Sequence, residues 1–293
     1  RAMSFAERGE LLKAMSRALY EHREELIALE ALNNGATRGD AKFDIDGATG
    51  TLAWYAKLGK EMGDARWQLC GDSDRLSSGA RFIGQHIRVP REGVAVHVNA
   101  FNFPGWGTFE KVAVAILSGM PVISKPATAT ALTAWRMAQI VVDADILPAG
   151  VFSFIAGSTG DLLEHLGPQD CIAFTGSAQT GAWFRELPAV RQLSTRIGVE
   201  ADSLNAAVLG PDVAVGDEVW HTFIRNIVKD MTQKTGQKCT AIRRIMIPEA
   251  IADAVAETLT EELAGLKIGT PADSSVGMGP LATAQQLRDA RAG

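Results

Sequence analysis

The chain has 293 residues, enough for one large domain or two smaller ones at roughly 100–200 residues per domain. Its content of 46% hydrophobic and 22% charged residues excludes a disordered or collagen-like chain. The net charge is −5, no basic cluster occurs, and no apolar run reaches the ~18 residues of a membrane span, so we expect neither a nucleic-acid partner nor a membrane partner.

The cysteine and histidine patterns argue against several kinds of site. Cys70, Cys171 and Cys239 are far apart and form no C-x-x-C pair, which disfavours a disulfide scaffold and a zinc site and is typical of a reducing compartment. The histidines show no metal-ligand spacing, and no serine lies in G-x-S-x-G. We therefore expect a cytoplasmic protein without a metal, and neither a zinc hydrolase nor a serine esterase.

The N-terminal part predicts helices followed by a strand. Ser4 and Glu7 have the spacing of a capping box, which predicts that a helix begins at Phe5. Apolar residues then recur at helical spacing until Asn33-Asn34-Gly35, where this helix is expected to end. A second helix is predicted over 46–63 and a strand over 83–89.

Short apolar runs alternate with helical stretches from residue 94 onward. Strands are expected at 94–98, 121–124, 151–155, 171–174 and 195–199, and helices at 109–117, 131–143, 160–166 and 181–187. Nearly continuous apolar strands that alternate with helices predict a parallel α/β sheet covered on both faces.

The C-terminal part predicts a second layer. A strand at 206–209, a helix at 217–234, a strand at 242–247 and a helix at 248–266 follow one another. We place the domains at 1–204, with the N-terminal helices, and at 205–293. Because the chain begins with Arg1 and stops at Gly293 after an unfinished helix, we expect it to be a piece of a longer protein.

Cys239 is the first candidate for chemistry. It lies in a glycine-containing turn, and the neighbouring Lys238 and Lys234 are expected to favour its thiolate. The alternative is a small buried residue with no reactivity. Cys171, in an apolar strand, and Cys70 are interpreted as packing residues.

Glu200 and Asn102 are two further candidates. Glu200 ends a strand-like run beside small residues, where a carboxylate can act as a base; the alternative is a loop carboxylate in water. Asn102 lies in the loop after a buried strand, where its amide can donate to a developing oxyanion; the alternative is that it satisfies turn backbone groups.

Two other segments follow predicted strands. Lys125 directly follows one, so its amine can reach ribose hydroxyls or phosphate, unless it is an ordinary surface lysine. Segment 174–181 runs from a strand into a helix, and its glycines and helix N-terminus suit a phosphate. It contains neither G-x-G-x-x-G nor a P-loop, so by itself the signal is weak.

Together these segments resemble the aldehyde dehydrogenase superfamily. The resemblance rests on Phe101-Asn102-Phe103-Pro104, Ser124-Lys125-Pro126-Ala127, Phe174-Thr175-Gly176-Ser177 and Gly236-Gln237-Lys238-Cys239, which occur in the family's order. The amino-acid sequence around Glu200 and around Cys239 is similar to that of one subgroup of the family. This subgroup includes the aldehyde dehydrogenase half of the bifunctional phenylacetate-degradation protein. Relatives that oxidise CoA-linked semialdehydes in benzoate degradation belong to the same subgroup.

The resemblance implies a Rossmann-like cofactor domain, the start of an α/β catalytic domain, and a role for each motif residue. Cys239 would be the nucleophile, Glu200 the general base that activates water, and Asn102 an oxyanion donor. The residues implied to bind the cofactor are Phe101, Ser124, Lys125, Thr128, Gly176 and Ser177. The expected reaction is NAD(P)-dependent oxidation of an aldehyde, possibly CoA-linked, to the carboxylic acid.

The resemblance also bears on the cofactor and on the rest of the protein. Thr128 lies where NAD-preferring relatives often carry a glutamate, so we expect NADP, with NAD possible; alternatively, Thr128 only caps the helix that follows. The family's later Glu-x-Phe-Gly-Pro motif and final strand do not occur in this chain. The longer protein is expected to be a homo-oligomer, and the alternative function is a catalytically incomplete cofactor-binding or assembly fragment.

Overall fold

The computed structural model describes residues 2–79 and 81–292, so Arg1, Ala80 and Gly293 lie outside the described residues. The chain begins with α1 (Phe5–Glu21), α2 (Arg23–Asn34) and α3 (Arg38–Met62). The predicted capping box is confirmed, because the Glu7 N–H donates to Ser4 Oγ at 3.2 Å and the Ser4 N–H donates to Glu7 Oε2 at 2.6 Å.

Two helix boundaries differ from the sequence prediction. The first predicted helix is divided at His22, which is the C-cap of α1 and the N-cap of α2. Its predicted end is confirmed, since Gly35 adopts the left-handed conformation with φ 77°. The third helix begins at Arg38 instead of residue 46, because the Thr37 hydroxyl accepts from the Asp40 N–H and caps the helix there.

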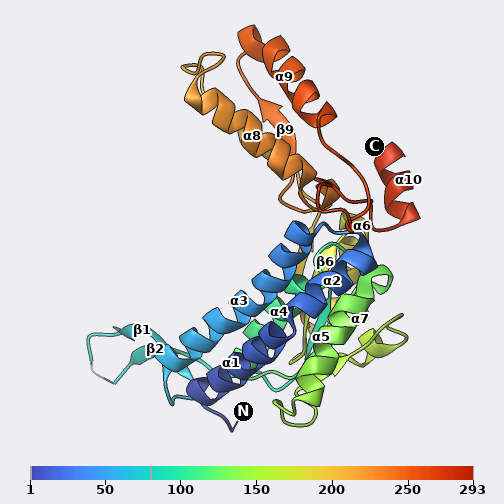
Figure 1. Ribbon diagram of the computed structural model, residues 1–293. Coiled ribbons are helices and arrows are strands. Elements are labelled where there is room, and N and C mark those ends of the chain that lie inside the picture. Colours follow the sequence, from blue (N-terminus) through green and yellow to red (C-terminus); the bar gives the residue numbers. More distant parts are fainter. Residues whose placement is uncertain (1, 80, 293) are drawn as a thin grey trace.

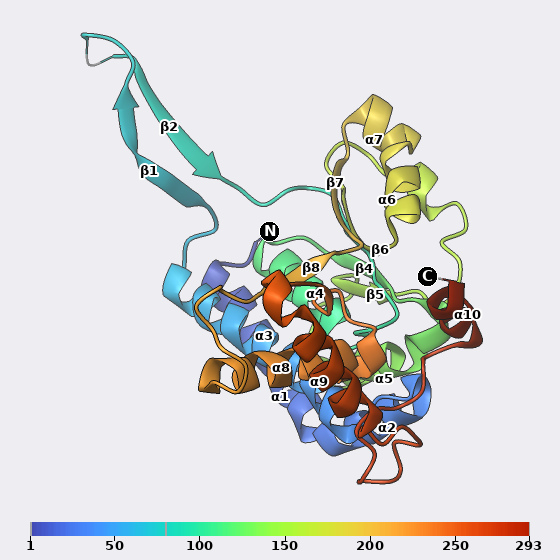
Figure 2. The same ribbon diagram turned by 90° about the horizontal axis from the view of Figure 1, so that it is seen from above.

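The predicted parallel sheet is confirmed (Figure 1), and seen from above it lies between two helical layers (Figure 2). Its strands occur in the order β5-β4-β3-β6-β7 and all neighbours are parallel. The strands are β3 (Ala95–Val98), β4 (Val122–Lys125), β5 (Phe152–Phe154), β6 (Cys171–Gly176) and β7 (Arg196–Ala201). Numbered along the chain within this sheet the order is 3-2-1-4-5, which is the Rossmann order.

Alternate residues of β3 enter different hydrophobic clusters. Ala95 packs with the N-terminal helices, with α4 (Trp106–Leu117) and with α5 (Ala131–Asp143). Val96 packs on the other face with α6 (Ala178–Arg185) and α7 (Pro188–Leu193). This double burial explains why the strands read as nearly continuous apolar runs.

The local predictions in this region vary in accuracy. The range of α5 is confirmed at both ends. The expected helix at 160–166 is only the 3₁₀ turn η2 (Leu162–His165). The helix expected at 181–187 begins earlier as α6, and α7 is a separate helix that the sequence analysis missed.

A two-stranded antiparallel arm, β1 (Gln68–Arg75) and β2 (Ile83–Arg88), projects from the body (Figure 2). The sequence analysis predicted β2 and missed β1. Both strands are largely exposed, and their exposed apolar side chains include Leu69, Ile83 and Ile87. Cys70, interpreted from sequence as a packing residue, lies on this arm and pairs with His86; it belongs to none of the hydrophobic clusters of the described residues.

The C-terminal part has its own hydrophobic cluster. The parallel strands β8 (Asn205–Val208) and β9 (Ile242–Met246) are covered by α8 (Glu218–Thr232) and α9 (Ala252–Ala264). The 3₁₀ turn η4 (Glu249–Ile251) precedes α9, and α10 (Ala284–Ala292) follows it in the chain. The division at residue 204 stays a prediction. Within the described ranges, no helix is long and apolar enough to cross a membrane.

Candidate active site

A cleft opens beside the carboxyl ends of the parallel strands. The strand order reverses between β3 and β6, and open α/β sheets bind ligands at such a reversal. The cavity there has a volume of about 920 Å³, which is within the usual range for ligand sites. Residues implied by the resemblance that line it are Phe101, Asn102, Lys125, Gly176, Ser177, Glu200 and Cys239.

The loop that carries Asn102 is anchored on both sides. On one side, the Thr130 hydroxyl donates to the Phe101 carbonyl at 2.8 Å. On the other, the buried carboxylate of Asp44 accepts the N–H groups of Gly105 at 3.0 Å and Trp106 at 2.6 Å. Both backbone groups lie at the start of α4, where a negative charge is favourable. The position of Asn102 in the cleft therefore depends on residues from α3 and from the start of α5.

Cys239 lies in an irregular turn between α8 and β9. Lys234 and Thr235 have φ of 52° and 58°, and Gly236 has φ of 69°, so three consecutive residues adopt the left-handed region. The Cys239 carbonyl accepts hydrogen bonds from Ser203 Oγ and from Asn205 Nδ2, the latter at 2.5 Å. Because these bonds fix the Cys239 carbonyl, they orient the exposed thiol at the cleft.

The expectation that Lys234 and Lys238 favour the Cys239 thiolate is wrong. Both lysines are buried, and their ammonium groups pair with Glu30 and Asp230 respectively. The pKa of the Cys239 thiol is instead raised, first by burial and then by the negative charge of Glu200. The backbone N–H groups of Cys239 and Thr240 act in the opposite direction. The resting thiol is therefore protonated around neutral pH.

Glu200 lies on β7 and faces the same cleft as Cys239. Its Oε2 accepts a hydrogen bond from Thr175 Oγ1 at 3.3 Å. Two residues later Asp202 adopts φ of 51°, in the left-handed region. Aspartate is among the residues that tolerate this region, so the turn after Glu200 forms without a glycine.

The influence of Glu200 on Cys239 leads to a pH-dependent prediction. In Glu200→Gln, the midpoint for alkylation of Cys239 by iodoacetamide should move to lower pH, because a carboxylate that disfavours the thiolate has been removed. The rate should be followed by mass spectrometry of the Cys239 peptide from pH 6 to 10. An unchanged or higher midpoint would contradict the interaction between the two side chains.

Lys125 is the cation of the cleft that best fits an anionic or hydroxylated ligand. It ends β4, it is half-buried, and burial lowers the pKa of its amine. Its Nζ donates to the Pro126 carbonyl at 3.1 Å, and no described carboxylate forms an ion pair with it. Ser177 is the N-cap of α6, where its hydroxyl accepts the Thr180 N–H at 3.2 Å.

The structure places two predicted cofactor residues away from the cavity lining. Ser124 is fully buried, and its Oγ accepts from Asn99 Nδ2 at 3.3 Å. Thr128 is exposed at the start of the 3₁₀ turn η1 (Thr128–Thr130). The alternative that Thr128 caps the following helix is wrong, because Ala127 is the N-cap of η1 and Thr130 is the N-cap of α5.

Sequence reasoning missed the residues that hold the site in place. Asp44 supports the Asn102 loop, while Ser203 and Asn205 bind the Cys239 carbonyl. Each is distant in sequence from the group that it orients. Asn205 had one available signal, since it lies five residues after Glu200 in a run that resembles the family subgroup.

Comparisons with known proteins agree on one family, the aldehyde dehydrogenases. The aldehyde dehydrogenase family model matches residues 1–292. A 3,4-dehydroadipyl-CoA semialdehyde dehydrogenase of Aromatoleum evansii is 46% identical over 98% of this chain and 56% of the relative. A non-phosphorylating aspartate-semialdehyde dehydrogenase of Halomonas elongata is 30% identical over 100% of this chain and 56% of the relative.

Solved structures share the fold. The protein PnpE in complex with nicotinamide adenine dinucleotide is 26% identical, with a TM-score of 0.84 over 99% of this chain and 56% of PnpE. Betaine aldehyde dehydrogenase from Staphylococcus aureus in complex with NAD⁺ has a TM-score of 0.85 over 99% of this chain and 55% of that protein, at 22% identity. The chain thus spans about half the length of these relatives. From its first described helix to its last, the chain belongs to the aldehyde dehydrogenase family.

Proposed function

We propose that the protein containing this chain oxidises an aldehyde to the carboxylic acid with NAD(P), through a covalent intermediate on Cys239. The observation that carries the proposal is the convergence of Cys239, Glu200 and Asn102 in one cleft. They come from a turn before β9, from β7 and from the loop after β3, and the cleft lies at the reversal of the strand order.

The proposed chemistry assigns one task to each side chain. The Cys239 sulfur attacks the aldehyde carbon and forms a thiohemiacetal. Because the resting thiol is protonated, its proton must leave for solvent as the sulfur attacks, and the exposed position of Cys239 at the cleft allows this. The Asn102 amide and the Cys239 N–H donate to the oxyanion.

NAD(P), when bound in the cleft, would supply the acceptor for the hydride. The product is then a thioester on Cys239, and Glu200 takes a proton from the water that attacks it. This step releases the free acid and restores the thiol. The family's CoA-acylating branch lacks the glutamate, so Glu200 supports hydrolysis over acyl transfer to CoA.

The described residues fit a dinucleotide. The ammonium of Lys125 has no carboxylate partner in the described ranges, so it suits adenosine ribose hydroxyls. The backbone at Gly176 and the N-terminus of α6 line the cleft beside it, where a pyrophosphate is favoured. Because the Ser177 hydroxyl already caps α6, we assign pyrophosphate binding first to backbone N–H groups of this turn.

The substrate class that we propose is a CoA-linked semialdehyde of aromatic-acid degradation, on the basis of the 46% identical relative. The natural protein containing this chain should oxidise such a semialdehyde with a kcat/KM at least about tenfold above that for the free aldehyde of equal chain length. This ratio corresponds to about 1.4 kcal/mol of additional transition-state binding. Reduced cofactor should be followed by absorbance with a panel of both substrate types.

Other outcomes of this assay are informative. Equal kcat/KM for both substrate types would refute the CoA-linked substrate and leave the aldehyde oxidation intact. Cofactor binding with no turnover on any aldehyde would refute the enzyme and favour the alternative of a cofactor-binding or assembly fragment.

We also propose that the protein is cytoplasmic and that it forms a homo-oligomer. The exposed apolar side chains of the arm β1–β2 support the oligomer.

We further propose that NADP is preferred over NAD. Thr128 is exposed three residues after Lys125, where a glutamate would repel a 2′-phosphate of about −1.5 to −2 charges. Thr128→Glu should therefore reduce kcat/KM for NADP far more than for NAD. The measurement is kcat/KM with each cofactor, and Thr128→Gln is the matched control without a charge. A wild-type preference for NAD that is unchanged in Thr128→Glu would contradict this role.

A further inference from the structure

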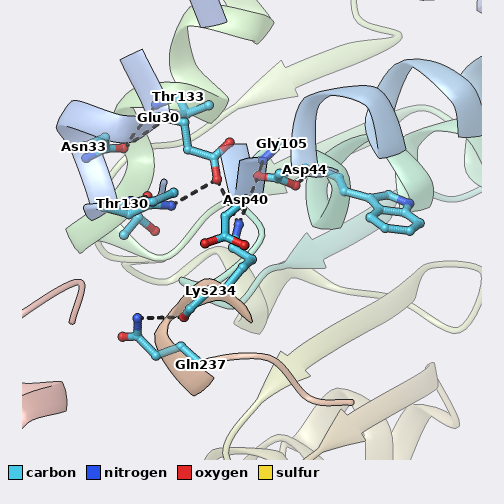
Figure 3. A network of polar contacts seen from close by, with 12 residues as sticks. Glu30, Asn33, Asp40, Asp44, Gly105, Thr130, Thr133, Lys234 and Gln237 are labelled. Atoms are coloured by element: carbon cyan, nitrogen blue, oxygen red, sulfur yellow. Dashed lines mark hydrogen bonds and ion pairs between the residues drawn. The ribbon is translucent and has the colours of Figure 1, made fainter. Parts of the chain in front are cut away.

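Lys234 lies where three parts of the chain meet: the N-terminal helices, the Asn102 loop (residues 101–106) and the Cys239 turn (residues 234–240). Figure 3 shows Lys234 among acidic residues of α2 and α3. Its Nζ lies 2.8 Å from Glu30 Oε1 on α2 and 3.9 Å from Asp44 Oδ2 on α3. The lysine side chain is 4% exposed and both carboxylates are 0% exposed. Such a buried group of charges links two elements that are about two hundred residues apart, since 204 positions separate Glu30 from Lys234.

The same ammonium also reaches the Asn102 loop. It lies 4.3 Å from the centroid of the Phe103 ring, a cation–π contact with the residue next to Asn102. Asp44, the second carboxylate near Lys234, is the acceptor for the N–H groups of Gly105 and Trp106. Lys234 therefore contacts the Asn102 loop through an aromatic ring and through the carboxylate that anchors it.

On the other side, Lys234 begins the turn that presents Cys239. Lys234 and Thr235 both have left-handed φ angles, which residues with a Cβ rarely adopt and which need support from surrounding contacts. The Lys234 carbonyl accepts a hydrogen bond from Gln237 Nε2 at 3.2 Å, inside the same turn. The ion pair with Glu30 thus holds the first residue of the turn, and the backbone continues from there to Cys239.

Lys234 is not suited to transfer protons. Burial opposes its charge, but the charges of Asp44 and Glu30 outweigh burial and raise the pKa of the amine. Burial and the charge of Asp44 raise the pKa of Glu30 well above its usual value. The ammonium therefore stays charged throughout the pH range of the reaction, and Lys234 does not line the large cavity. A positioning role is the one that remains compatible with this environment.

We propose that Lys234 is a positioning residue that ties the Cys239 turn to the Asn102 loop and so sets the spacing of the two oxyanion donors. This inference rests on the proposed function for its consequence in catalysis. The tie connects two backbone segments, and this connection can be tested without any substrate.

The test uses the natural protein with Lys234→Met combined with Glu30→Gln, which removes the cation together with one of its carboxylates. We expect faster backbone hydrogen exchange in both 101–106 and 235–240. The hydride-transfer burst should slow by about 10- to 100-fold, the scale for a small misplacement of reacting groups. Cofactor affinity should be unchanged. The matched control is Arg23→Met, which breaks the Arg23–Asp46 ion pair between the same two helices away from both loops.

The outcomes separate the inference from the proposed function. Exchange that rises in 235–240 but not in 101–106, or that rises equally in the Arg23→Met control, would overturn the tie. A rise in exchange in both segments of the double variant, together with a wild-type protein that oxidises no aldehyde, would support the tie and refute the proposed function. If the double variant does not fold, Phe103→Leu decides: loss of the cation–π contact should raise exchange in 235–240, and no rise would overturn the tie.

Discussion

Replacing Cys239 by alanine is expected to abolish aldehyde oxidation while cofactor binding remains. Removal of a catalytic nucleophile commonly lowers kcat by about 10⁴-fold or more. The reason here is that Cys239 is the exposed cysteine of the cleft, whereas burial raises the pKa of Cys171 within β6. The measurements are kcat for aldehyde oxidation and the dissociation constant of the cofactor, followed by tryptophan fluorescence.

Cys171→Ala is the matched control. Cys171 is half-buried at the start of β6, where it packs against the main hydrophobic cluster, so its removal should affect stability more than turnover. Near wild-type turnover in Cys239→Ala would refute the nucleophile. Loss of activity in both variants would instead indicate that the cleft depends on the packing of the sheet.

The second large effect is expected from Glu200→Gln. A general base contributes typically about 10²–10⁴-fold, so hydrolysis of the thioester should slow by such a factor. Hydride transfer precedes hydrolysis and should slow less. Stopped-flow absorbance should therefore show a burst of reduced cofactor followed by a slow steady state, because the acyl-enzyme accumulates.

The matched control for this variant is Glu186→Gln. Glu186 follows α6 and forms an exposed ion pair with Arg191, and its loss should leave both kinetic phases unchanged. Unchanged burst and steady-state rates in Glu200→Gln would show that Glu200 is not the base. Equal slowing of both rates would place Glu200 in an earlier step, such as removal of the Cys239 proton.

Much of the local structure follows from short-range sequence patterns. The capping box at Ser4, the left-handed stop at Gly35 and both ends of α5 are readable because each depends on neighbouring residues. The beginning of α3 and the strand β1 were missed. A polar first turn hides the periodicity of α3, and β1 is exposed along most of its length, so it carries no clear apolar pattern.

The candidate site was predictable as a set of residues in a given order. Asn102, Lys125, Gly176 and Glu200 each follow or end a predicted strand, and parallel strands present such positions at one edge. Cys239 instead lies in the turn before a predicted strand. What sequence could not predict was the direction in which each side chain points. Ser124 and Lys125 are adjacent, yet Ser124 is buried and Lys125 lines the cleft, because neighbouring side chains of a strand face opposite sides.

The sequence by itself determined the alternation of strands and helices in the parallel sheet, the family resemblance and seven of the residues that line the cleft. The tertiary structure alone decided the electrostatics of Cys239. Proximity in sequence predicted that Lys234 acts on Cys239, but its charge pairs with Glu30, 204 positions away. Burial, and after it the negative charge of Glu200, raise the pKa of the Cys239 thiol. Burial and charge depend on which segments meet in space, and chain folding, not sequence spacing, brings these segments together.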